Sequence, residues 1–157
     1  MKDRSAPITL HEADPRAPEA RSCLAAYYAE LALRFPGGFD VTLSRDPDAA
    51  EMIRPRGVFL VAANATGAIG CAGLKGHGCW GEVKRLWIAP AVRGAGLATR
   101  LMAAIEAAAR DLGMTLLRLD TNAALTEAVA MYRKAGWAEI PRFNDDPYPD
   151  AFFEKRL

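Results

Sequence analysis

A short glycine-containing stretch, Arg93 to Ala98, has the residue types and spacing of an anion-binding turn. It follows an apolar run that stops at Pro90, and it opens a long segment whose apolar residues have helical spacing. The first N–H groups of a helix have no carbonyl partner within the helix, and the helix dipole adds partial positive charge there. Gly94 and Gly96 allow a ligand to approach this backbone closely. The stretch therefore predicts a site for a phosphate or pyrophosphate.

The same turn lacks the residues of two common phosphate-binding loops. No Gly-Lys-Ser or Gly-Lys-Thr ends it, which excludes a Walker loop. The dinucleotide fingerprint G-x-G-x-x-G fails because Thr99 stands at the position of the third glycine. A plain tight connection, in which the glycines bind nothing, is the alternative interpretation.

The flanks of the turn carry a family resemblance. Arg93, Gly96 and Ala98 match, in register, the Gln/Arg-x-x-Gly-x-Gly/Ala motif with which the GNAT family of N-acetyltransferases binds acyl-CoA. Residues 82–90 resemble the fourth strand of that family, and residues 130–137 are similar to its LYxxxGF segment. The resemblance covers roughly residues 82–157 and is looser before them.

The resemblance implies where acetyl-CoA, the acyl donor and cosubstrate, would bind; no metal is expected. The phosphates would lie on the turn, and the pantetheine amides would bond backbone groups of the preceding strand where a neighbouring strand diverges. The N–H of Leu86 would bond the thioester carbonyl. Leu125 stands where the family often has an asparagine that holds the cofactor, so Asn122 is the substitute candidate. The residues expected to bind the cofactor are Leu86, Trp87, Ile88, Arg93, Gly94, Ala95, Gly96, Leu97, Ala98 and Asn122.

Glu82 and Tyr132 are the candidates for acid–base chemistry. A primary alkyl amine, with a pKa of about 10.4, is mostly protonated at pH 7, so a nearby carboxylate can accept its proton. Glu82 stands eleven residues before Arg93, the spacing at which some family members carry such a base. Tyr132 matches the family tyrosine that protonates the leaving thiolate. The alternatives are a surface Glu82 paired with Lys84 or Arg85, a chain of waters in place of one base, and a Tyr132 that only packs.

Hydrophobic periodicity predicts the elements that must position these groups. In the strand with Glu82, period-two alternation places Glu82, Lys84, Leu86 and Ile88 on one face. One helix is expected to start with Asp14 as N-cap and Pro15 in its first turn, and a shorter one at residues 46–47. Strands are expected near residues 7–12, 58–63, 68–74, 82–88, 115–121, 137–140 and 151–155, and helices over 14–35, 46–53, 97–112 and 123–135, the last with Asn122 as N-cap.

This order favours an α+β, or mixed α/β, fold. The family resemblance implies a central, mostly antiparallel twisted sheet of about six to seven strands flanked by about four helices. The loop 143–149 is interpreted as a surface connection rather than a lid.

Composition limits the classes of protein that fit. The 157 residues, 51 % hydrophobic and 25 % charged, suit a single domain spanning 1–157. A net charge of +1 without a basic stripe argues against nucleic acid or an anionic membrane as a partner. No apolar run approaches the roughly eighteen residues that span a bilayer, so we expect a cytoplasmic protein. Three cysteines without C-x-x-C spacing predict neither a disulfide framework nor a metal site.

We therefore predict an N-acetyltransferase that moves an acetyl group from acetyl-CoA to a primary amine by direct attack on the thioester. The acceptor is a small molecule or a peptide, which these residues do not distinguish. A module that binds acyl-CoA without catalysis, as a sensor or partner, is the alternative; the presence of Glu82 and Tyr132 argues against it. A homodimer through the last strands is left open by the adjacent Phe152 and Phe153.

Overall fold

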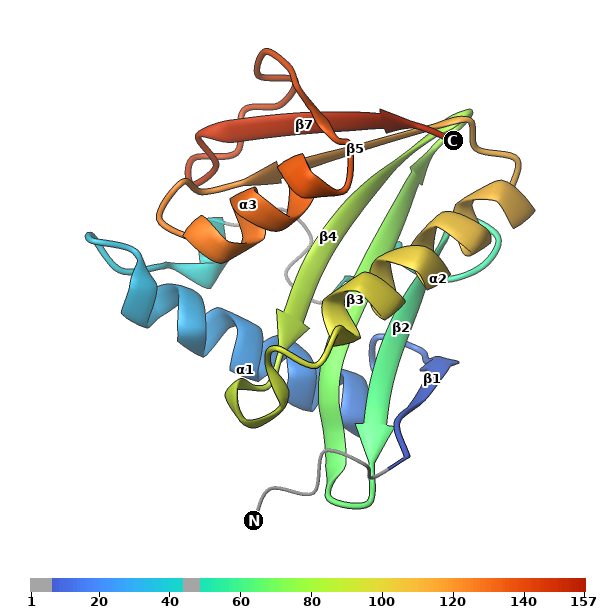
Figure 1. The fold of residues 1–157 in the computed structure, drawn as a ribbon, viewed down its shortest axis with the longest axis vertical. Coiled ribbons are helices and arrows are strands. Elements are labelled where there is room, and N and C mark those ends of the chain that lie inside the picture. The colour runs from blue at the N-terminus through green and yellow to red at the C-terminus, as the bar shows by residue number, and fades with distance from the viewer. Residues whose placement is uncertain (1–6, 44–48) are drawn as a thin grey trace.

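The computed structural model describes residues 7–43 and 49–157, and these form a seven-stranded sheet with helices on both faces (Figure 1). The strand order is β1-β2-β3-β4-β5-β7-β6. All neighbouring strands are antiparallel except β4 and β5, which are parallel. The strands are β1 (Thr9–Glu12), β2 (Gly57–Asn64), β3 (Gly67–His77), β4 (Trp80–Ile88), β5 (Leu116–Thr121), β6 (Ala138–Glu139) and β7 (Ala151–Arg156); the helices are α1 (Pro18–Arg34), α2 (Leu97–Asp111) and α3 (Thr126–Lys134).

The sheet separates two hydrophobic clusters because its central strands are apolar on both faces. In β2, Val58 and Leu60 pack into the cluster with α2 and α3, whereas Phe59 and Val61 face the other way, toward α1. Figure 1 shows α2 and α3 on the viewer's side of the sheet. The α+β fold and all seven expected strands are confirmed. No helix of the described residues is long and apolar enough to cross a bilayer.

Helix α1 begins at Pro18, four residues after the expected N-cap. The Asp14 carboxylate instead closes a turn, in which Oδ1 accepts the backbone N–H of Arg16 at 2.8 Å. Pro18 then occupies the first turn of the helix, where a missing N–H is tolerated. The expected start at Asp14 and Pro15 is therefore wrong.

The shorter helix expected over residues 46–53 is not present in the part of it that the structure describes. Residues 49–53 form turns and bends, and residues 44–48 lie outside the described residues. The described chain thus has three α-helices where about four were expected, with two additional 3₁₀ turns at Val41–Leu43 and Pro90–Val92.

Helix α3 also starts later than expected, at Thr126 rather than at 123. The side chain of Asn122 accepts the backbone N–H of Ala124 at 2.9 Å, which closes a turn before the helix instead of capping it. Leu125 is the N-cap residue and provides no side-chain hydrogen bond. Helix α2 matches expectation, because it begins after Gly96 and ends before Gly113, both of which have positive φ.

Strand β4 contains a bulge at Arg85, which has a φ of +60°. The pairing with β3 is interrupted there, between Cys71 and Gly73. The side-chain alternation is shifted as a result. Leu86 and Ile88 pack into the cluster with α2 and α3, and so does Val83. Lys84, which was expected on the same face as Leu86, is not part of this cluster. The expectation of one shared face from Glu82 to Ile88 is therefore wrong beyond the bulge.

Strands β4 and β5 diverge after a short ladder. Trp80 to Val83 pair with Leu116 to Leu119, and the ladder ends there. Past this point β5 continues alongside β7, and β4 runs toward the start of α2. Figure 1 shows the two strands meeting at one end and separating toward the other. The opening between them positions the site.

Candidate active site

A groove of about 410 Å³ lies where β4 has left β5. We call it the outer groove. Its walls come from α1, from the second half of β4, from the turn before α2 and from α3. The residues that line it are Tyr27, Glu30, Leu31, Arg34, Leu86, Trp87, Ile88, Val92, Arg93, Gly94, Gly96, Leu97, Ala98, Leu125, Glu127, Ala128 and Met131.

The turn at the start of α2 presents free backbone donors to this groove. Gly94 and Gly96 have φ values of +83° and +81°, a region that favours glycine. No side chain caps the helix, so the N–H groups of its first turn have no side-chain acceptor. A Cβ added at either glycine would meet nothing within 4 Å, so the space above this backbone is open. Ala95 is exposed and lies outside the lining.

Arg93 lies in the groove but is already partly bound. Its Nε donates to the Ile88 carbonyl at 2.9 Å, and its Nη2 pairs with the Glu30 carboxylate of α1. The Ile88 carbonyl thus already accepts one hydrogen bond, and its expected contact with a ligand amide stays a prediction. Nη1 of Arg93 has no partner among the described residues, so one face of the guanidinium remains available.

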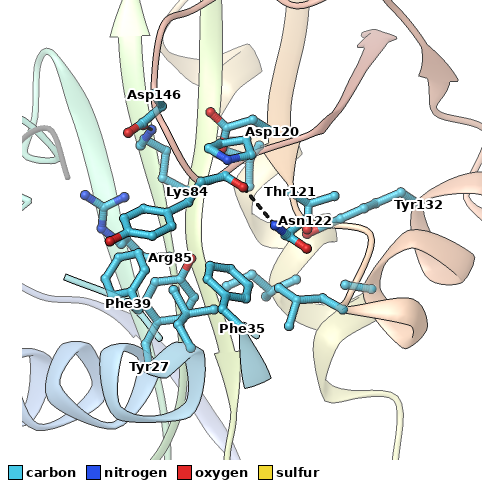
Figure 2. Close-up of a pocket in the computed structure, with 17 residues that line it drawn as sticks. Tyr27, Phe35, Phe39, Lys84, Arg85, Asp120, Thr121, Asn122, Tyr132 and Asp146 are labelled. Carbon is cyan, nitrogen blue, oxygen red and sulfur yellow. Dashed lines mark hydrogen bonds and ion pairs between the residues drawn. The ribbon is translucent and has the colours of Figure 1, made fainter. Parts of the chain in front are cut away.

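A smaller cavity of about 100 Å³, which we call the inner pocket, adjoins the outer groove. Figure 2 shows the residues that line it. The two cavities share five lining residues, which mark their junction: Tyr27, Leu31, Leu86, Leu125 and Ala128. One end of the pocket is aromatic and the other is charged. Figure 2 shows Tyr27, Phe35 and Phe39 at the lower end, and Lys84, Asp120 and Asp146 at the upper end. The other residues in its lining are Val83, Arg85, Thr121, Asn122, Tyr132, Tyr148 and Pro149.

Tyr132 points from α3 into the inner pocket (Figure 2). Its ring is 6 % exposed and packs against Trp137 and Phe153, each at a centroid distance of 6.0 Å. Burial raises the pKa of the Tyr132 phenol well above its usual value, and the nearby Tyr27 and Asp120 add to the rise. The hydroxyl has no hydrogen-bond partner in the described part of the chain. Every buried polar side-chain atom of the described residues has a hydrogen-bond partner. A hydroxyl without a partner is therefore not fully buried, and this one is open to the pocket.

Glu82 does not line either cavity. It is 6 % exposed; its Oε1 is 3.0 Å from Nε2 of His77, and its Oε2 accepts from Nζ of Lys84 at 2.9 Å. Burial alone would raise the pKa of Glu82, but Lys84 and His77 outweigh it and hold the pKa below its ordinary value. The alternative interpretation of Glu82 included this pairing with Lys84, but it expected a surface carboxylate, and Glu82 is buried. The role of Glu82 as a base stays a prediction. Lys84 itself lines the pocket, with Asp146 at 3.9 Å.

Asp120 is a pocket residue that the sequence did not single out. One carboxylate oxygen, Oδ2, accepts from the Asn144 amide at 2.6 Å. Burial raises the pKa of Asp120, although the charge of Lys84 and this hydrogen bond partly offset the rise. One signal could have identified Asp120 as a pocket residue. It is an acidic residue between Leu119 and Thr121, in a strand whose other residues are half-buried or buried.

The loop 143–149 forms a wall of the inner pocket through Asp146, Tyr148 and Pro149. Tyr148 packs on Phe39 at a centroid distance of 4.5 Å, and its hydroxyl accepts the backbone N–H of Asp40 at 2.6 Å. The interpretation of this loop as a mere surface connection is therefore wrong.

Asn122 faces the inner pocket and not the outer groove. Its amide nitrogen donates to the Tyr148 carbonyl at 2.8 Å, while its oxygen accepts the N–H of Ala124. Both ends of the side chain are thus committed to the protein, which argues against the expected contact with the cofactor. Asn122 links the start of α3 to the loop 143–149.

The chain matches known proteins over most of its length. The model of the acetyltransferase (GNAT) family matches residues 24–137. An IAA acetyltransferase of Azospirillum brasilense is 36 % identical over 116 residues, which cover 70 % of this chain and 74 % of that protein. An uncharacterised N-acetyltransferase of Schizosaccharomyces pombe is 32 % identical over 125 residues, 74 % of this chain and 76 % of that protein. The crystal structure of a GNAT-family acetyltransferase from Staphylococcus aureus superposes with a TM-score of 0.83 at 17 % identity, covering 96 % of this chain and 99 % of that one.

Proposed function

We propose roles for the two cavities from the premise that the chain belongs to the acetyltransferase (GNAT) family and is an acetyl-CoA-dependent N-acetyltransferase. The outer groove binds acetyl-CoA. The inner pocket binds the acceptor amine, and the acetyl group is transferred at their junction. The observation that carries this assignment is that Leu86 lines both cavities, while the open hydroxyl of Tyr132 lies in the inner one.

The turn from Arg93 to Ala98 would hold the donor's pyrophosphate. Free N–H groups and the helix dipole favour an anion at this position, and the positive φ of Gly94 and Gly96 keeps side chains away from it. Nη1 of Arg93 would add a charge-assisted hydrogen bond to a phosphate oxygen. The pantetheine arm would follow β4 past Trp87 toward Leu86, along backbone that has no strand partner on its β5 side.

The chemistry at the junction would be direct attack of the amine on the thioester. The N–H of Leu86 would polarise the acetyl carbonyl, and Tyr132 would protonate the sulfur as it leaves. A raised pKa keeps the Tyr132 phenol protonated at neutral pH, so it can donate but cannot act as the base.

The inner pocket favours a compact acceptor with an apolar body. At roughly 10–15 Å³ for each water-sized group, its volume of about 100 Å³ holds few atoms beyond those of a small amine. The aromatic side chains of Tyr27, Phe35, Phe39 and Tyr148 would contact the apolar part of that molecule. The charged end would contact the amine.

The test combines thermal unfolding, with and without acetyl-CoA, with an assay of free thiol release. The amines are 2-phenylethylamine, L-phenylalanine, spermidine and a peptide with one lysine; 2-phenylethanol, which has no nitrogen, is the matched control. We expect acetyl-CoA to raise Tm, and one of the two aromatic amines to release thiol fastest. A raised Tm without release from any amine would favour a binding module, and an unchanged Tm would contradict the donor site.

A further inference from the structure

Three carboxylates lie at or near the charged end of the inner pocket. Asp146 is 3.9 Å from Nζ of Lys84, and the other two, Glu82 and Asp120, differ in their availability. Glu82 has one oxygen bound to His77 and the other to Lys84, and it does not line the pocket. Asp120 lines the pocket and has only Oδ2 bound, to Asn144. Its Oδ1 has no partner among the described residues, and no buried polar side-chain atom there is unpartnered, so Oδ1 is open to the pocket. A ligand in the pocket can therefore reach Asp120, whereas Glu82 is not part of the pocket wall.

Asp120 also lies near the groups that would handle the thioester. It acts electrostatically on the phenols of both Tyr27 and Tyr132, one at the junction and the other beside it. The neighbouring residues Thr121 and Asn122 are in the same pocket wall. In Figure 2, Asp120 and Tyr132 belong to the walls of one cavity, and Asp146 and Lys84 lie at the upper end with Asp120. A nitrogen that binds Asp120 is thus in the pocket that contains the sulfur's proton donor.

We propose that Asp120, and not Glu82, is the catalytic carboxylate that removes the proton from the acceptor ammonium. The inference rests on the proposed role of the inner pocket. Oδ1 takes one proton from the ammonium, and the nitrogen lone pair then forms the C–N bond to the acetyl carbon. The C–S bond breaks, and its electron pair leaves with sulfur, which takes the proton of the Tyr132 hydroxyl. The second proton of the attacking nitrogen restores Tyr132, and Asp120 releases its proton to solvent.

The electrostatic surroundings of Asp120 suit this role better than those of Glu82. Burial raises the pKa of Asp120 above its ordinary value, whereas Lys84 and His77 hold the pKa of Glu82 below its own. A base is most effective when its pKa lies near the working pH. The titratable or charged groups that act on Asp120 or share its pocket come from four parts of the fold: Lys84, Glu82 and Arg85 from β4, Asp146 and Tyr148 from the loop, Tyr27 from α1 and Tyr132 from α3.

The experiment compares Asp120→Asn with Glu82→Gln, two changes that keep shape and remove one charge. The Asn carbonyl at 120 can still accept from Asn144, so we expect acetyl-CoA to raise Tm as in the unchanged protein. With the fastest of the four amines at pH 7, Asp120→Asn should lower kcat/KM by about 10²- to 10⁴-fold. It should also remove the rise of kcat/KM with pH that the deprotonation of Asp120 produces. Glu82→Gln should change kcat/KM by less than about tenfold and keep that rise.

A second acceptor separates proton removal from structural damage. An O-alkyl hydroxylamine is already neutral at pH 7, so the first proton transfer is not needed. Asp120→Asn should therefore lose much less activity with this acceptor than with the alkylamine. An equal loss with both acceptors, or a larger loss for Glu82→Gln than for Asp120→Asn, would overturn the proposal.

A third measurement does not depend on turnover. A carboxyl-carbon NMR titration should give Asp120 a pKa above its ordinary value of 3.8. A pKa at or below that value would overturn the proposal even if no acceptor were found. If the unchanged protein released thiol from no amine while Asp120 titrated as expected, the failure would lie in the proposed function instead.

Discussion

Replacement of Gly96 by alanine tests the phosphate-binding role of the turn before α2. Gly96 has a φ of +81°, and an added Cβ meets no protein atom within 4 Å. The loss of stability therefore comes only from the left-handed backbone, which costs about 1–2 kcal/mol for a residue with a Cβ. At roughly 2–4 °C per kcal/mol for a domain of this size, Tm should fall by about 2–8 °C.

Gly113 is a matched control at the opposite end of the same helix. It has a φ of +82°, and its Cβ would also meet nothing within 4 Å, but it does not line the outer groove. Gly113→Ala should therefore lower Tm by a similar amount. Only at Gly96 should the new methyl group occupy space that the donor's phosphates need.

The readout is the rise in Tm that acetyl-CoA produces in each variant. At a concentration about 100 times Kd, a ligand adds about 2.7 kcal/mol, or roughly 5–11 °C here. Tenfold weaker binding removes about 1.4 kcal/mol of this, roughly 3–6 °C. We expect Gly113→Ala to keep the full rise and Gly96→Ala to lose at least this part. Equal rises in the two variants would refute a donor seated on this turn.

Three further predictions concern single side chains. Tyr132→Phe keeps the ring packing but removes the proton donor. We therefore expect kcat to fall by about 10²-fold or more, with an unchanged effect of acetyl-CoA on Tm. A kcat near that of the unchanged protein would reject the acid role. Glu82 has a lowered pKa, so its charged form stabilises the fold fully above its ordinary pKa of 4.5, and this contribution is lost as the pH falls through the lower folded-state value. Urea unfolding should accordingly show a difference between Glu82→Gln and the unchanged protein that is largest near pH 7 and shrinks below about pH 4.5; a constant difference would count against the ion pair with Lys84. Glu30→Gln removes a negative charge beside Arg93. Calorimetry at low salt should therefore show acetyl-CoA binding about two- to fivefold tighter, and this gain in affinity should be smaller at high salt. Weaker binding would mean that the pair with Glu30 positions Arg93 for the ligand.

The features predicted correctly from the sequence depend on residues close together in the chain. Gly94 and Gly96 make the turn because each takes a positive φ, which glycine does without a steric penalty. The strands expected near 58–63 and 68–74 are joined by a turn in which Asn64 accepts the N–H of Thr66 at 2.9 Å. Each of these can be recognised within a window of a few residues.

The features that were missed depend on contacts between distant residues. The bulge at Arg85 places a non-glycine residue at positive φ, and no local pattern indicates this. Asp120 lies in the pocket wall, where Asn144, 24 positions later, binds one of its oxygens. Asn122 faces the same pocket and donates to the Tyr148 carbonyl, 26 positions away. A single sequence contains no direct record of such pairings.

The short parallel ladder between β4 and β5 has a mechanical consequence. Only four residue pairs form it, and beyond them the sheet is split into a part with β1 to β4 and a part with β5 to β7. Across the split, Arg34 of α1 pairs with Glu127 of α3, and its Nη2 donates to Oε2 at 2.8 Å. Beyond the ladder the two parts are therefore joined by side chains and not by the sheet: besides this ion pair, Tyr148 packs on Phe39, and Lys155 of β7 donates to Glu106 of α2 at 2.7 Å. These contacts, with the shared hydrophobic cluster, set the angle between the two parts. A donor molecule lodged in the opening would contact both parts at once and hold that angle constant, so we expect amide hydrogens to exchange more slowly on both sides of the split when it binds.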